Sequence, residues 1–81
     1  MSQLATKQSL LDAADYRYNF DREIYFNRST KKIFSVDFIE DHAPAEIEER
    51  IREDTDGRDW KFYCNVEPSD YVKREIARVL G

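Results

Sequence analysis

The sequence predicts an α+β fold, a two-layer sandwich in which two helices from the C-terminal half cover one face of a three-stranded, mostly antiparallel sheet. Two observations support this fold class. Apolar and polar side chains alternate over residues 16–38 and 60–66, which is the pattern of strands with one buried face. Apolar residues one helical turn apart mark two helices, over 44–54 and 68–80. The expected order of elements is (α)ββαβα.

The N-terminal residues, 1–14, are polar apart from a few leucines and alanines. Ser9 is suited to cap a short helix that runs to Ala14, because its hydroxyl can accept a bond from a free backbone N–H. The same composition suits a frayed tail. Both alternatives stay open, and residues 15–81 are expected to form a single domain.

Aromatic residues are concentrated in the stretch that predicts the first two strands. Seven of the eleven aromatic residues lie there: Tyr16, Tyr18, Phe20, Tyr25, Phe26, Phe34 and Phe38. Arg22 interrupts the alternation, which indicates a bend or bulge between two extended pieces. Residues 28–31 are a turn sequence, and a second strand is expected over 32–39.

The register of these two strands depends on the length of the turn between them. A turn with an odd number of residues pairs Phe26 with Phe34 and Ile24 with Val36, so that apolar residues share one face. A turn with an even number places Ile24 opposite Ser35, which mixes the two kinds of residue. We therefore expect the odd turn.

The second half of the chain predicts a helix, a third strand and a final helix. Pro44 suits a first helical turn, and Ile47 and Ile51 form the buried stripe. Asp41 or Ala43 would be the preceding cap, and Asp41 is the chemically better candidate. Alternation then predicts the third strand, whose inward residues are Trp60, Phe62, Cys64 and Val66. The final helix has apolar residues with helical spacing at Val72, Ile76, Val79 and Leu80.

Charge and composition narrow the possible functions. The net charge is −4, and residues 37–59 contain ten acidic and three basic side chains, which disfavours general attraction to nucleic acid. No apolar run is long enough for a membrane helix, and residues 1–14 lack the features of a signal peptide, so a small acidic cytoplasmic protein is expected. The single cysteine, Cys64, excludes an internal disulfide.

No catalytic, cofactor-binding or metal-binding residues are predicted. His42 is the only histidine, and Cys64 has the parity of a buried strand residue, so a catalytic pair is not indicated. The acidic turn around Gly57 does not fit a calcium loop, because Arg52 and Tyr63 would occupy ligand positions. We expect a protein that is not an enzyme.

The outward-facing side of the predicted sheet is the candidate functional surface. It would carry aromatic, aliphatic and basic residues, namely Tyr25, Tyr63, Ile33, Lys31, Lys32 and Lys61. Such a face suits a protein partner or a homodimer, and it also suits stacking of single-stranded nucleic acid bases. A third alternative is that Leu4, Leu10, Leu11 and Tyr16 fold back and cover it.

The expected function is therefore a small non-enzymatic interaction or regulatory module. It would bind a protein partner, or itself, through a tyrosine-bearing sheet face or a strand edge. Single-stranded nucleic acid binding by the sheet tyrosines with Lys31, Lys32 and Lys61 is the alternative.

Overall fold

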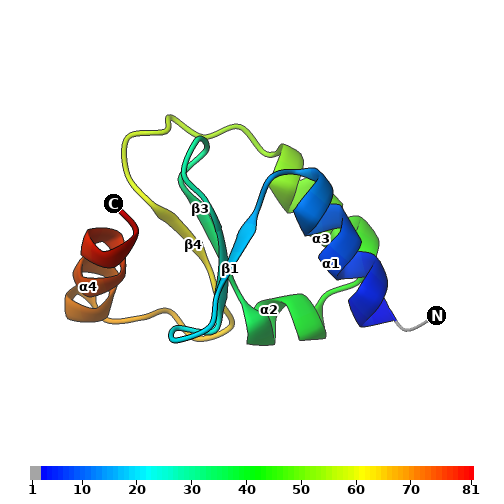
Figure 1. Cartoon of the computed structure of the whole chain (residues 1–81), viewed down its shortest axis with the longest axis horizontal. Coiled ribbons are helices and arrows are strands. Elements are labelled where there is room, and N and C mark those ends of the chain that lie inside the picture. Colours follow the sequence, from blue (N-terminus) through cyan, green and yellow to red (C-terminus); the bar gives the residue numbers. More distant parts are fainter. Residues whose placement is uncertain (1–2) are drawn as a thin grey trace.

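The computed structural model describes residues 3–81, with side chains from Thr6 onward, and the fold is α+β with a mixed sheet (Figure 1). The helices are α1 (Gln3–Ala13), α2 (Val36–Asp41), α3 (Pro44–Arg52) and α4 (Asp70–Leu80). The strands are β1 (Arg17–Asn19), β2 (Ile24–Asn27), β3 (Lys32–Ser35) and β4 (Lys61–Tyr63). They lie in the order β1-β2-β3-β4, in which the first two pairs are antiparallel and β3 is parallel to β4.

Helices cover both faces of this sheet, so the expected two-layer arrangement is wrong. Figure 1 shows α1, α2 and α3 on one side of the sheet and α4 alone on the other. The first side holds a buried cluster of Leu11, Tyr16, Phe34, Phe38, Ile39, Ile47 and Tyr63. The second holds Ile24, Phe26, Ile33, Ile76 and Leu80. Each face of the sheet therefore has its own core.

The register between β2 and β3 also differs from the expected one. Ile24 lies opposite Ser35, Tyr25 opposite Phe34 and Phe26 opposite Ile33, across a turn of four residues, 28–31. The prediction of an odd turn assumed that only one face is buried. Because both faces are buried, the even turn places apolar residues in each core. The reason for expecting an odd turn, which was to collect the apolar residues on one face, therefore does not apply.

A fourth strand arises because the interruption at Arg22 is a hairpin turn and not a bulge within one strand. The Asn19 side-chain oxygen accepts from the Arg22 N–H at 3.0 Å, and Glu23 has a left-handed φ of 52°. These are turn features. The expected count of three strands is therefore wrong, and β1 becomes an edge strand of the sheet.

The second predicted strand is shorter than expected, because it ends at Ser35 and is followed by α2. The Ser35 hydroxyl accepts from the Phe38 N–H at 3.1 Å, which is the geometry of a helix N-cap. Phe38 and Ile39 are therefore helical residues, and both are buried against the first core.

The three later elements match the predicted types. The helix α3 begins at Pro44 but is preceded by Ala43 and not by Asp41 as its cap residue. It leads to β4, which covers only 61–63 of the predicted strand. The last helix, α4, is capped by the Ser69 hydroxyl. Within residues 3–81, no helix is both long and apolar enough to cross a membrane.

The N-terminal residues from Gln3 to Ala13 are helical, and α1 packs beside α3 on the first face. Leu11 from this helix and Tyr16 after it belong to the first core, as the covering alternative expected. The side chain of Leu4, named with them, lies outside the described residues. The helix ends in a left-handed residue, Asp15, with a φ of 65°.

Candidate interaction surface

The outward face expected from the sequence does not exist as one surface. Ile33 is fully buried beneath α4, whereas Tyr63 is 7% exposed on the opposite face, where its ring stacks on Phe34 at 4.7 Å. Burial raises the pKa of the Tyr63 hydroxyl. These two residues belong to the cores because the real register assigns them to different faces, and both of those faces are covered.

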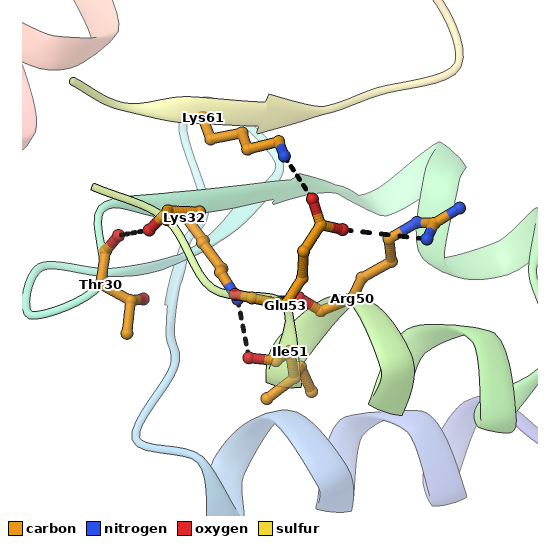
Figure 2. Close-up of polar contacts among 7 residues, drawn as sticks. Thr30, Lys32, Arg50, Ile51, Glu53 and Lys61 are labelled. Carbon is orange, nitrogen blue, oxygen red and sulfur yellow. Dashed lines mark hydrogen bonds and ion pairs between the residues drawn. The ribbon is translucent and has the colours of Figure 1, made fainter. Parts of the chain in front are cut away.

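Lys32 is also buried, with 1% of its surface exposed, and its ammonium group caps the end of α3. It donates to the carbonyl oxygens of Arg50 at 2.8 Å and Ile51 at 2.7 Å, and also to that of Glu53 (Figure 2). Arg50 and Ile51 lie in the last turn of α3, where Arg50 O also accepts from Glu53 N at 3.3 Å, and a cation favours this negative end of the helix dipole. Lys32 is therefore a structural residue and not part of a basic surface.

Lys61 lies at the surface, where it forms an ion pair with Glu53, and the Glu53 carboxylate also contacts Arg50 at 3.8 Å (Figure 2). The hydrogen bond from Lys61 lowers the pKa of the Glu53 carboxyl and raises that of Lys61. Lys31 donates to the carbonyl of Arg58 at 3.1 Å. The three lysines of the predicted basic face thus have partners within the fold.

Two more cationic side chains cap helices in the same way as Lys32. The buried Lys7 ammonium donates to Ile39 O at 2.6 Å and Glu40 O at 3.1 Å, at the end of α2. Arg28 Nε donates to Leu80 O at 2.8 Å, at the end of α4. The sequence gives no signal of these caps, because donor and helix are at least 32 positions apart in both cases.

A group of adjacent aromatic residues with exposed rings lies elsewhere, on the hairpin formed by β1 and β2. Tyr18 lies directly opposite Tyr25, with ring centroids 4.9 Å apart, and Phe20 lies edge-on to Tyr18 at 6.3 Å. Phe20 is 81% exposed and Tyr18 is 45% exposed. We call these three residues the aromatic strip. Sequence reasoning identified Tyr25 and considered Tyr18 as one of the tyrosines that could need a partner, but it assigned Phe20 no role, since recognising Phe20 required the turn at 20–23.

A shallow cavity adjoins the aromatic strip on the side of α1 and α2. Its volume is about 270 Å³, and it is lined by Gln8, Tyr18, Tyr25, Val36, Ile39 and Glu40. The Gln8 amide donates to the Tyr25 hydroxyl at 3.3 Å, which orients that tyrosine at the wall of the cavity. The strip therefore combines two exposed rings, Phe20 and Tyr18, with a partly buried ring, Tyr25, that packs against the first core, and a recess lies next to them.

The two residues weighed for catalysis lie in ordinary structural environments. His42 Nδ1 lies 2.7 Å from the carbonyl oxygen of Phe38, and its ring stacks on the Phe38 ring at 3.8 Å. Burial raises the pKa of the Cys64 thiol, so less of it is the reactive thiolate. Within the part of the chain that the structure describes, no group of three or more metal-binding side chains is present.

Comparison with known proteins gives no relative from which a function can be transferred. No protein-family model, no curated protein and no solved structure matches this chain.

Proposed function

We propose that this chain is a small, non-enzymatic interaction or regulatory module that binds a protein partner, or a second copy of itself, through the aromatic strip. The single observation that supports this proposal is the exposure of Phe20 and Tyr18 on an edge hairpin. Large aromatic side chains are favourable when buried and are enriched at protein interfaces. Phe20 projects from a turn where no core contact requires an aromatic residue.

The position of the strip agrees with a binding role. Phe20, Tyr18 and Tyr25 lie in one row, each ring in contact with the next. Such a row presents a continuous apolar surface that a partner can cover as a unit, whereas isolated exposed apolar residues are common and carry no such meaning.

Single-stranded nucleic acid is the alternative partner, and it has less support. Stacking on the strip is chemically possible, but phosphate binding needs uncommitted cations. Lys32 is buried, Lys61 is paired with Glu53 and Lys31 donates to a backbone carbonyl. The net charge of −4 further opposes phosphate attraction.

Site-specific photo-cross-linking in the producing cells tests the proposal. A photoreactive benzoylphenylalanine is placed at position 20 in one variant and at position 71 in a control. Tyr71 is the matched control because it is an exposed aromatic residue, 67% exposed, but lies on α4 and outside the strip.

We expect position 20 to give one or more adducts of defined mass that position 71 does not give. An adduct at twice the mass of the chain would identify the partner as a second copy. Equal sets of adducts from both positions, or adducts from position 71 alone, would count against the aromatic strip as the contact surface.

A further inference from the structure

A cavity of about 350 Å³ lies between α4 and the face of the sheet that this helix covers, and we call it the α4 cavity. Its apolar lining comes from β2, from β4 and the loop after it, and from α4, namely Ile24, Phe62, Val66, Pro68, Val72 and Ile76. Small-molecule sites are cavities of roughly 300–1,000 Å³ with a mostly apolar lining and a few polar groups. The α4 cavity has the volume and the lining of such a site.

The α4 cavity lies where two parallel strands end. β3 ends at Ser35 and β4 ends at Tyr63, and these ends lie at the same edge of the sheet because the strands run in the same direction. Asp37 lines the cavity after the first strand, and Cys64 and Asn65 line it after the second. In sheets with parallel strands, ligands bind in crevices at the carboxyl ends of the strands, where side chains from separate strands converge. The position of the cavity in the sheet therefore also favours a ligand site.

The interior of the α4 cavity is apolar, whereas its rim is charged. Ile24 and Ile76 in the lining are 4% and 5% exposed. The charged lining residues Asp21, Arg22 and Asp37 are all exposed to solvent. A ligand that complements both parts has an apolar body and a charged or polar end.

The rim carries more carboxylates than cations. In the α4 cavity Asp21 and Asp37 are accompanied by one guanidinium, that of Arg22. A smaller hollow of about 120 Å³ shares Arg22 and Asp37 and adds the carboxylate of Glu23. Among residues 6–81, none of these four side chains takes part in an ion pair. The rim therefore has a net negative charge that no ion pair within the fold neutralises.

The other polar groups beside the cavity leave acceptors and not donors for a ligand. Lys73 lies over the Phe62 ring at 5.7 Å, and its ammonium group is already paired with Glu67. The Asn65 amide nitrogen donates to Asp37 O at 3.2 Å, which leaves the amide oxygen as the group that can accept. An ammonium group supplies three N–H donors and a positive charge, so it complements this rim.

We propose that the α4 cavity binds a small primary amine with an apolar body, which lies between α4 and the sheet while the ammonium group lies at the rim beside Asp21 and Asp37. This site goes beyond the proposed function and does not depend on it. The cavity shares no residue with the aromatic strip, whose Tyr25 packs against the first core on the other face of the sheet.

Three probes that share one apolar body test this inference: phenethylamine, phenethyl alcohol and hydrocinnamate. Each is titrated into the full chain, isotopically labelled at the isoleucine methyl groups, and followed by NMR. Ile24 and Ile76 line the cavity, whereas Ile39 and Ile47 belong to the first core and are the internal control. We expect saturable shifts at Ile24 and Ile76 alone, with a Kd for the amine roughly threefold below that for the alcohol. The anionic hydrocinnamate should bind most weakly.

Three results of this titration would overturn the proposal. Absence of saturable shifts at Ile24 and Ile76, or equal shifts in both cores, would show that the cavity is not a ligand site. Tightest binding of hydrocinnamate would assign the ligand to Arg22 and exclude the amine. Equal affinities for the three probes would show that the rim does not recognise charge.

The double variant Asp21→Asn/Asp37→Asn tests the role of the rim. We expect the amine to lose most of its preference over the alcohol, because two carboxylates are removed. Asp56→Asn/Asp59→Asn is the matched control, since it changes the net charge equally but lies in the loop before β4, outside the α4 cavity. The readout is the ratio of two affinities on one variant, so partial damage to the cavity affects both probes alike. A preference that survives in the first variant, or falls equally in both, would overturn the position of the ammonium group.

Val72→Trp tests the position of the apolar body, because a larger side chain at this wall occupies the cavity. Val79→Trp is the control, since Val79 lies on the same helix, is 55% exposed and does not line the cavity. We expect Val72→Trp to weaken phenethylamine roughly tenfold and Val79→Trp to bind it as the parent does. Circular dichroism verifies the fold of both variants. Unchanged affinity in a folded Val72→Trp variant would overturn the site.

Discussion

The ammonium group of Lys32, on the central strand β3, lies 2.7 Å from the carbonyl oxygen of Ile51 at the end of α3. This contact ties the sheet to a helix of the first face. Lys7 ties α1 to α2, and Arg28 ties the turn between β2 and β3 to the end of α4. Three cationic side chains therefore cap the C-terminal ends of three helices from distant parts of the chain. These three side chains are not available to bind a partner.

Replacement of Lys32 by methionine removes the cap but keeps most of the buried volume. The partly buried carbonyls of Ile51 and Glu53 would lose this donor, whereas Arg50 O would keep the bond from Glu53 N. We expect the free energy of unfolding to fall by about 3 kcal/mol. Urea denaturation followed by circular dichroism measures this change.

Lys31→Met is the matched control for that substitution, since Lys31 is the chain neighbour and donates to a single carbonyl in an exposed setting. We expect a change within about 0.5 kcal/mol. Equal losses in the two variants would show that the cap at α3 contributes nothing specific.

The cation caps illustrate why sequence reasoning identified the element types better than the functional residues. Amphipathic spacing and alternation are local signals, and they correctly predicted α3, α4 and the strand at 61–63. The local sequence around Lys32 is the same whether the side chain lies on the surface or caps a helix. Only its position next to the end of α3, 18 positions away, distinguishes the two.

The register error has a related physical origin. Alternation shows that neighbouring residues point to opposite faces, but it does not show how many faces are buried. Tyr25 and Ile33 were expected on one open side, whereas Tyr25 lies on the side of α1 and Ile33 beneath α4. The final helix was predicted on the same face as α3, but α4 lies on the other face, so Ile33 is a core residue and not a surface residue.

Asp15→Gly is expected to stabilise the protein by about 0.5–1 kcal/mol. Tyr16 N bonds Leu11 O and Asp15 N bonds Asp12 O, so α1 ends in a Schellman motif with Asp15 as its left-handed residue. Glycine adopts this conformation without the steric cost of a Cβ atom. Thermal and urea unfolding measure the effect.

Asp12→Gly has the opposite expected sign and serves as the control. Asp12 lies within α1, where glycine is disfavoured relative to ordinary helical residues by several tenths of a kcal/mol to about 1 kcal/mol. If both glycine variants are destabilised alike, the conformation at position 15 does not limit stability.

Stability is expected to fall in acid partly through Glu53. Its pKa lies below the ordinary value of 4.5, because Lys61 donates a hydrogen bond to the carboxylate. As the pH drops below that value, the unfolded chain takes up this proton first, so the free energy of unfolding decreases. The contribution is complete above the ordinary value and is lost as the pH passes through the folded-state pKa.

Lys61→Met tests this assignment by removing the donor. We expect the decrease in the free energy of unfolding below pH 4.5 to be shallower in this variant than in the parent chain. Lys31→Met, which removes a cation without a carboxylate partner, should leave the pH dependence unchanged. A parallel pH dependence in the parent and Lys61→Met would rule out the ion pair as its source.

Cys64 is expected to react slowly with thiol reagents while the protein is folded. Burial raises its pKa above the ordinary value of 9.0, and the nearby Ser35 only partly offsets this shift. At pH 8 a smaller fraction is thiolate in the folded chain than in the unfolded chain, and the half-buried sulfur is also less accessible. The rate of reaction with Ellman's reagent should therefore rise on addition of urea, with the same midpoint as unfolding followed by circular dichroism. A fast reaction in the absence of urea would instead identify an activated thiol and reopen the question of catalysis at this position.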